Sequence, residues 1–461
     1  MMKRSMLAAL AATALAAPAF AQRAPTAEQV AKVRDAALKD DLAYDIVEGI
    51  TTEVGQRLAG TEAEARGRTW AVAKLKAMGF SNVRVDPFDM PVWVRGEETA
   101  EVVSPFPQKL TLTALGNSGA TPAGGITAPI VFFETFADLQ AAPNNSLKGK
   151  IAFVSHAMQA TQDGSSYGQF GAARRAGPAV AASKGALAIL IRSIGSDRHR
   201  NPHTGGTNFP AGTAAIPAAA LAVPDAEMLE RMLDRGKPVS VKLVLTPRQT
   251  GVHQSGNVIA EIPGTDREAG IVLIGGHLDS WDLGTGAIDD SAGLGITAAA
   301  AKRVADMGRP RRTIRVVWFG AEEVGNFGGE AYAKAHAGDR HVLAAESDTG
   351  GDRVWKFETN LPENAKAIGD RLAIALAPLG ISRGRAVAGS GTDIGPVLAT
   401  GVAAVDLSQD ATRYFDAHHT PDDTIDRIDP EQLRQNVAAW TAMLATVANA
   451  PETLGPVSPR R

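Results

Sequence analysis

Residues 275–293 have the sequence GGHLDSWDLGTGAIDDSAG and concentrate residue types that bind metal ions. The stretch contains one histidine and four aspartates, namely His277, Asp279, Asp282, Asp289 and Asp290. It directly follows Ile271–Ile274, an apolar run typical of a buried strand. Unpaired ionised side chains are costly in so apolar a setting, and a divalent cation would compensate them. The stretch therefore predicts a metal site at the end of a buried strand.

Four later segments also place charged or imidazole side chains just past apolar runs. These side chains are Glu322, Glu323, Asp348, Asp393, His418 and His419. A single aspartate at a strand end is usually a helix cap or a turn residue, but five such placements, two with histidine, are hard to explain as caps. Two histidines and three carboxylates suit two zinc ions that share one bridging carboxylate. Mn²⁺ or Co²⁺ would accept the same ligands, and a calcium site or an ion-pair network is the alternative.

The composition excludes several other chemistries. The chain has 461 residues and no cysteine, so it offers no thiolate zinc ligand, no cysteine nucleophile and no disulfide. Its net charge of -3 lacks the basic excess of nucleic-acid-binding proteins, so nucleic acid is not an expected partner. The chemistry must therefore come from His, Asp, Glu, Ser or Tyr side chains.

The N-terminus has the pattern of a signal peptide over residues 1–21. Lys3 and Arg4 are basic, Met6–Ala17 is apolar, and Ala19-Phe20-Ala21 matches an A-x-A cleavage site before Gln22. A membrane anchor is the alternative, but the apolar run is short and rich in alanine for a bilayer span. We therefore expect export to the periplasm or secretion, without stable membrane insertion.

The elements that must position the candidate ligands divide into three stretches. Residues 22–120 begin with helical periodicity and continue into a strand, Asn82–Met90. The helices predicted there are Ala27–Lys39, Tyr44–Val54 and Thr61–Met78. Residues 121–246 have short β runs and two helical stretches, typical of a small inserted α+β module. Residues 247–461 alternate strands and helices, which predicts an α/β fold with a mixed, mostly parallel sheet flanked by helices and sites at the strands' carboxyl ends.

Ordered motifs over nearly the whole mature chain resemble metallopeptidase family 28, the co-catalytic di-zinc exopeptidases, and within it the carboxypeptidase Q type. Besides the stretch at 275–293, the motifs are VGQRLAGT at 54–61, WVRGEE at 93–98, AEEVG at 321–325, ESD at 346–348, GTD at 391–393 and HHTPDDT at 418–424. The module at 121–246 resembles a protease-associated domain, with KGKIAFV at 148–154. The resemblance implies the zinc exopeptidase fold, two Zn²⁺ per chain, a peptide substrate and a homodimer.

The resemblance also implies a role for each candidate ligand. His277 and Asp348 would bind one zinc, Glu323 and His419 the other, and Asp289 would bridge them. Asp279 would orient His277 from behind, with Asp393 as a further supporting residue. The peptide between Asp289 and Asp290 corresponds to one often found in the cis form in this family.

Glu322 occupies the place of the general base in the resemblance. Two zinc ions would lower the pKa of a bridging water, Glu322 would take its proton, and the hydroxide would attack the scissile carbonyl. The expected activity is hydrolysis of dipeptides or short peptides, with an aminopeptidase of the same family as the alternative. A single-zinc glutaminyl cyclase and a non-catalytic receptor-like ectodomain are less favoured, because every ligand position is filled.

Substrate recognition is less well determined by the sequence. In relatives the protease-associated module lies over the active-site cleft, so Arg192, Ser193 and His203 are candidates for binding a substrate terminus, although ordinary loop residues are the favoured interpretation. Tyr414 and His418 are candidates for polarising the oxyanion. Asp416 and Ala417 replace a more aromatic sequence of animal relatives, which leaves the oxyanion group and the pocket shape open.

Overall fold

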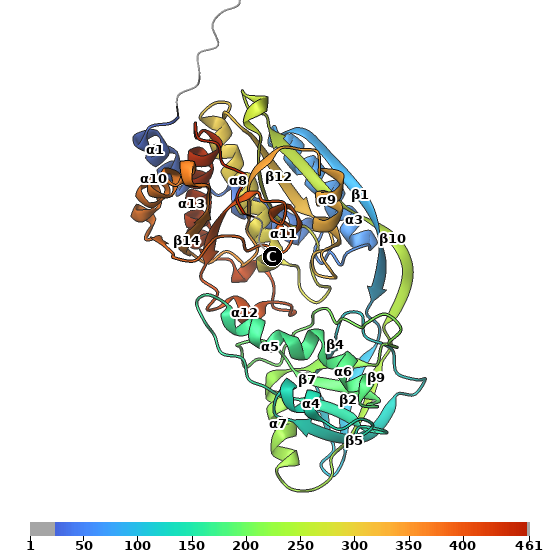
Figure 1. Cartoon of the computed structure of the whole chain (residues 1–461). Helices are drawn as coiled ribbons and strands as arrows, with labels where there is room; N and C mark the ends of the chain where they lie inside the picture. Colours follow the sequence, from blue (N-terminus) through green and yellow to red (C-terminus); the bar gives the residue numbers. More distant parts are fainter. Residues whose placement is uncertain (1–23, 459–461) are drawn as a thin grey trace, which may run out of the picture.

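The computed structural model describes residues 24–458, which form a larger and a smaller lobe (Figure 1). Each lobe is built around its own eight-stranded sheet. The predicted signal peptide, residues 1–21, lies outside the described residues. Within the part that is described, no helix is both long and apolar enough to cross a membrane.

The sheet of the larger lobe confirms the predicted mixed α/β fold. Its strands lie in the order β1 (Ser81–Val94), β10 (Arg248–Ile262), β12 (Thr313–Phe319), β11 (Ile271–His277), β13 (His341–Glu346), β16 (Ala403–Gln409), β14 (Val354–Asn360) and β15 (Ser382–Arg383). The four central strands, β12, β11, β13 and β16, pair in parallel. Their carboxyl ends therefore lie along one edge of the sheet, where the candidate ligands follow them.

Helices cover both faces of this sheet (Figure 1). One face packs against α8 (Ala292–Asp306) and α13 (Pro430–Ala448), over which α1 (Ala27–Ala37) and α2 (Leu42–Glu53) lie, and the other against α9 (Phe327–Ala335) and α11 (Gly395–Leu398). Strand β11 shows the reason: Val272 and Ile274 point into the first core and Leu273 into the second, because side chains alternate along a strand. The remaining helices of this lobe are α3 (Glu62–Ala77), α10 (Ala367–Leu376) and α12 (Tyr414–Ala417).

The smaller lobe contains the predicted α+β module. Its sheet has the order β3 (Gln108–Leu110), β2 (Glu98–Ser104), β9 (Ser240–Leu245), β5 (Ile126–Phe133), β6 (Ile151–Val154), β7 (Ala188–Arg192), β8 (Ala218–Leu221) and β4 (Leu112–Ala114). Its helices are α4 (Phe136–Ala141), α5 (Ser165–Arg175), α6 (Gly177–Ser183) and α7 (Val223–Leu233). Three of these strands, β2, β3 and β4, precede the boundary predicted at residue 121. They belong to this sheet because β2 pairs with β9 and buries Ala100 and Val102 in the core of the lobe.

Two long strands connect the lobes. β1 and β10 pair antiparallel from the larger sheet outward, with Pro91 opposite Val252, and continue towards β2 and β9 of the smaller lobe. In Figure 1 the helices α5 and α12 face each other where the lobes meet. Since α12 directly precedes His418 and His419, the candidate ligands lie beside this junction.

Candidate metal centre and active site

Asp289 lies between the two predicted histidine ligands. Its Oδ1 is 3.0 Å from Nε2 of His277, and its Oδ2 is 3.3 Å from Nε2 of His419. The side chain comes from the turn Ala287–Ser291 just before α8, where the backbone of Asp289 is not helical, and it is buried. One carboxylate thus presents one oxygen to each imidazole, which is the arrangement that a ligand bridging two metal ions requires.

The other two predicted ligands each lie beside one of the two histidines. Oδ1 of Asp348, just past β13, lies 3.4 Å from Nε2 of His277. Oε2 of Glu323, just past β12, lies 2.9 Å from Nε2 of His419. The parallel strands therefore bring together all five residues predicted as ligands, although they come from four segments of the sequence.

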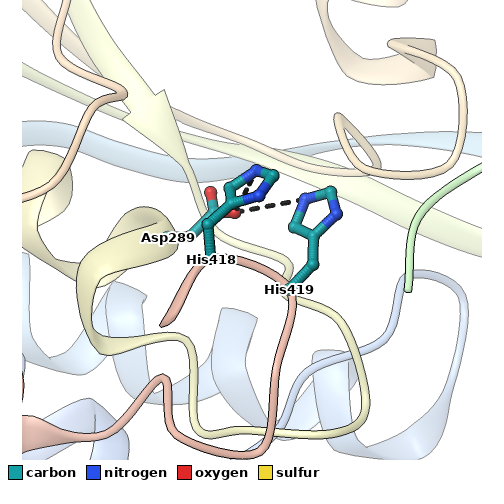
Figure 2. A group of neighbouring side chains, drawn as sticks. All are labelled: Asp289, His418 and His419. Carbon is teal, nitrogen blue, oxygen red and sulfur yellow. Dashed lines mark ion pairs between the residues drawn. The ribbon is translucent and has the colours of Figure 1, made fainter. Parts of the chain in front are cut away.

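Both histidines of the 418–419 pair approach Asp289 (Figure 2). The two rings stack with their centroids 3.5 Å apart, and Nε2 of His418 lies 3.4 Å from Oδ2 of Asp289. Only His419 also contacts Glu323, and its Nδ1 is 3.2 Å from the carbonyl oxygen of Thr204. A backbone carbonyl behind the imidazole is the usual support of a metal-binding histidine, so the contacts favour His419 as the ligand.

The residues at this site fit divalent metal ions. Oδ2 of Asp289 and Oε1 of Glu323 are buried without a hydrogen-bond partner among residues 24–458. Buried carboxylate oxygens in this state are costly unless a cation compensates them. The donors are imidazole nitrogens and carboxylate oxygens with no sulfur, which is a set that suits zinc.

The electrostatics of the two half-sites are consistent with missing positive charge. Burial lowers the pKa of His277, but the charges of Asp348 and Asp289 outweigh it and raise that pKa well above its usual value. Burial raises the pKa of Asp289, but the imidazoles of His277 and His419 beside its two oxygens bring it well below its usual range. Protons and metal ions would therefore compete for these imidazole nitrogens, and metal binding would release protons.

Comparison with known proteins identifies the family. Residues 257–444 match the family described as peptidase family M28. Carboxypeptidase Q of Bos taurus is 35% identical over 414 residues, which cover 89% of this chain and 86% of that protein. The chain belongs to peptidase family M28. It is therefore a metallopeptidase, a hydrolase that acts on peptides, and the predicted resemblance to carboxypeptidase Q is confirmed.

Solved structures agree with this assignment. A peptidase M28 precursor from Shewanella amazonensis SB2B shares 46% identity with this M28 peptidase at a TM-score of 0.91, covering 94% of this chain and 99% of that one. A zinc aminopeptidase from Bacillus subtilis, 20% identical at a TM-score of 0.64, covers 91% and 98% and has the same fold. These likenesses confirm the predicted fold class.

Asp279 supports the M28 metal centre differently from the prediction. The hydrogen-bond partner of Nδ1 of His277 is the carbonyl oxygen of Asp279 at 2.9 Å, whereas the carboxylate Oδ1 is 3.7 Å away. The carboxylate instead accepts the backbone N–H groups of Glu322 and Glu323, at 3.1 and 3.4 Å. Burial raises the pKa of Asp279 to about 7. Asp279 therefore orients the histidine through its backbone and both glutamates through its side chain.

Asp393 lies in a second, acidic layer with Glu346. Its side chain is fully buried, and neither oxygen has a hydrogen-bond partner in the described part of the chain. Glu346 accepts the backbone N–H groups of Thr392 and Ile394, on either side of Asp393. Burial raises the pKa of Glu346 to about 8, and burial with the charges of Glu346 and Glu322 raises that of Asp393 well above its usual value. Asp393 therefore lies in a buried acidic cluster with Glu346, and its supporting role at the metal centre stays a prediction.

Two residues at the site have backbone conformations that side chains rarely adopt. Ala321, which precedes Glu322, and His419 both have φ of 61°. Such conformations persist only where the surrounding structure holds them, and they cluster at active sites. The Asp289-Asp290 peptide is cis, as the resemblance implied.

A cavity of about 490 Å³ opens over the metal centre and gives room for a small peptide. Four of the predicted ligands line it together with Glu322, Tyr414 and His418. Burial raises the pKa of Glu322 well above its usual value, although the charge of His277 acts to lower it. Burial and the neighbouring His419 lower the pKa of His418 well below its usual value, so its imidazole is neutral.

The three residues predicted from the module to bind a substrate terminus do not line this cavity. Arg192 is engaged by two glutamates of α7, Glu227 at 2.9 Å and Glu230 at 3.8 Å. Oγ of Ser193 accepts the backbone N–H of His203, whose ring nitrogen Nε2 is 2.5 Å from Asp197. Their polar groups are used inside the smaller lobe, so the structure gives them no role in substrate binding.

Sequence reasoning missed Arg57, although it lies in the VGQRLAGT motif. Its side chain is fully buried, and burial lowers its pKa to about 10. The guanidinium donates to Oγ of Ser291 and to backbone carbonyls of Gly55, Leu278, Thr285 and Gly286. Arg57 thus ties together both ends of the loop that joins His277 to Asp289.

Replacing Arg57 with Met should destabilise the enzyme and weaken metal binding. Leaving buried carbonyls unsatisfied costs ~1–3 kcal/mol each, so we expect a loss of several kcal/mol and partial metal occupancy. Urea denaturation and elemental analysis of the purified variant measure both effects. Arg66→Met, on the exposed side of α3, is the matched control. A variant with wild-type denaturation midpoint and metal content would show that Arg57 does not hold the loop.

Proposed function

We propose that this M28 peptidase is an exported, zinc-dependent exopeptidase that hydrolyses dipeptides or short peptides, with Glu322 as the general base. The observation that carries the proposal is the position of Asp289 between two half-sites, His277 with Asp348 and His419 with Glu323. Glu322 lines the same cavity as these ligands. Export rests on the N-terminal pattern, and a homodimer rests on the family resemblance alone.

The residues present divide the work of peptide hydrolysis among them. When bound, two Zn²⁺ would polarise the scissile carbonyl and lower the pKa of a water to near neutrality. The carboxylate of Glu322 would accept the proton of that water and return it to the leaving amine. Asp279 holds the backbone of Glu322 and Glu323 in place, so base and ligand keep a fixed spacing. Tyr414, buried and lining the cavity, remains a candidate donor to the oxyanion.

An aminopeptidase of the same family is the second candidate function. Aminopeptidase YwaD of Bacillus subtilis is 25% identical over 87% of this chain. The two activities differ in which substrate terminus must be free. An aminopeptidase recognises the α-amine, whereas a carboxypeptidase recognises the α-carboxylate. A glutaminyl cyclase and a metal-free receptor are disfavoured, since the structure brings all five predicted ligands together.

The test is hydrolysis of a dipeptide panel by the purified mature protein, combined with elemental analysis. We expect about two equivalents of zinc per chain and turnover that a chelator abolishes and zinc restores. Substrates with free termini, a blocked amine or a blocked carboxylate separate the two candidate functions. Activity that resists the chelator, or a metal content well under two equivalents, contradicts the proposed di-zinc site.

A further inference from the structure

A buried arginine without an acidic partner lies in the wall of the active-site cavity. Arg174, on α5 of the smaller lobe, is 7% exposed and lines the cavity together with Glu322 and His419. Among residues 24–458, no carboxylate lies within ion-pair distance of its guanidinium, and its Nε has no hydrogen-bond partner. A buried, unpaired charge is costly, so the position calls for an anion from outside the chain.

The hydrogen bonds of Arg174 occupy only one of its terminal nitrogens. Nη1 donates to the hydroxyl of Tyr167 at 2.5 Å and to the carbonyl oxygen of Thr204 at 3.3 Å. Nη1 also lies 3.3 Å from Nδ1 of His419, which shares the Thr204 carbonyl. The Nε and Nη2 edge donates to no residue of the described chain. Nε is enclosed beside Gly205, so Nη2 is the donor left for the carboxylate of a ligand in the cavity.

The surroundings keep the guanidinium in this position. Gly205 has φ of 134°, and a Cβ there would lie 2.2 Å from Nη1, so a larger residue would displace the arginine. The guanidinium carbon is 5.4 Å from the centre of the Tyr167 ring, which stacks on Phe415 at 4.5 Å. The charge is therefore held in place before any ligand arrives, which reduces the entropy lost on binding.

We propose that Arg174 binds the C-terminal carboxylate of the peptide substrate. The inference rests on the proposed exopeptidase function and names the group that selects its substrates. Arg174 faces the Nδ1 edge of the His419 ring, whereas Glu323 and Asp289 face the Nε2 edge. Arg174, Glu322 and His419 line one cavity, so a peptide bound over the metal ligands can reach the guanidinium.

The experiment compares a dipeptide with its C-terminal amide in wild-type enzyme and in Arg174→Gln. We expect wild-type kcat/KM to be about 10²-fold higher for the free acid, because the amide loses charge-assisted hydrogen bonds. Arg174→Gln should lower kcat/KM about 10²-fold for the free acid, mainly through KM, and leave the amide within about threefold. Metal content should stay at the wild-type level. Arg174→Lys should restore part of the loss, because it keeps the charge without the planar guanidinium.

Two further variants guard against misfolding and unspecific effects. Tyr167→Phe keeps the stacked ring but removes the hydroxyl that Nη1 contacts, and it should raise KM for the free acid alone. Arg198→Gln, in the same lobe with a side chain 80% exposed, should behave as wild type on both substrates.

Three results would overturn the inference. If wild-type enzyme cleaves the amide as fast as the free acid, no carboxylate is recognised, although the peptidase function stands. If Arg174→Gln loses metal, or loses both substrates equally, Arg174 merely supports His419 through Thr204. If the metal-loaded wild-type enzyme cleaves neither substrate nor any other peptide of the panel, the proposed function fails and the inference falls with it.

Discussion

Replacing Glu322 with Gln should reduce turnover by about 10²–10⁴-fold while both metal ions stay bound. Glu322 lines the cavity beside the ligands but makes none of the close contacts to His277 or His419 that the ligands make. Glutamine keeps the size of the side chain and removes its ability to accept a proton. We therefore expect a loss in kcat with KM little changed, measured on a free dipeptide together with elemental analysis.

The control for this variant is Glu330→Gln, an exposed glutamate in the first turn of α9. It removes one carboxylate from the same lobe without touching the cavity, and its kinetics should match wild type. Near wild-type turnover in Glu322→Gln would rule out the general-base role. A loss of metal from Glu322→Gln would instead make Glu322 a ligand, and the predicted division between Glu322 and Glu323 would be wrong.

The ligand set could be predicted because local sequence and sheet geometry point to the same place. Asp348 and Glu323 each follow an apolar run, and parallel strands end at a shared edge, so the sequence positions imply proximity. The element that contradicts this simple rule is Asp279, whose carboxylate supports the glutamates rather than His277. Asp279 follows His277 by two residues, and this spacing predicts a contact between them. Whether the backbone carbonyl or the carboxylate of Asp279 makes that contact depends on the turn after β11.

Substrate-binding residues could not be predicted in the same way. Arg192 and Arg174 both lie in the inserted module, and nothing in their immediate sequence says which one has acidic partners. Arg192 meets Glu227 and Glu230 because α7 packs beside β7, a contact between segments far apart in sequence. Tyr167 lies seven residues before Arg174 and therefore on the same face of α5, but this spacing does not reveal whether Arg174 has an acidic partner.

The boundary of the module was difficult for a related reason. The segment from Glu98 to Ala114 has short runs with many polar residues, so its strands are weak signals on their own. They form because β2 and β4 add to the two sides of a sheet whose other strands come later in the chain. Pairings that depend on distant partners give little periodicity in the local sequence.

Replacing Asp289 with Asn should remove both metal ions, whereas Asp348→Asn should remove one. Asp289 presents an oxygen to each half-site, so loss of its charge weakens both, while Asp348 pairs with His277 in one half-site. We expect elemental analysis to give close to zero and about one equivalent, respectively. Because the metals provide several kcal/mol to the reaction, Asp289→Asn should lose about 10³-fold or more in turnover.

Thermal unfolding distinguishes the loss of both metal ions from a general defect in folding. Ions that bind only the folded state raise its stability, so a chelator should lower the Tm of the wild-type enzyme. It should lower the Tm of Asp348→Asn by less, because only one ion is bound there. The Tm of Asp289→Asn should not change. If Asp289→Asn kept one equivalent of metal and a chelator-sensitive Tm, the half-sites would be independent. Asp289 would then be a ligand of one half-site, and a different group would have to bridge the metal ions bound by His277 and His419.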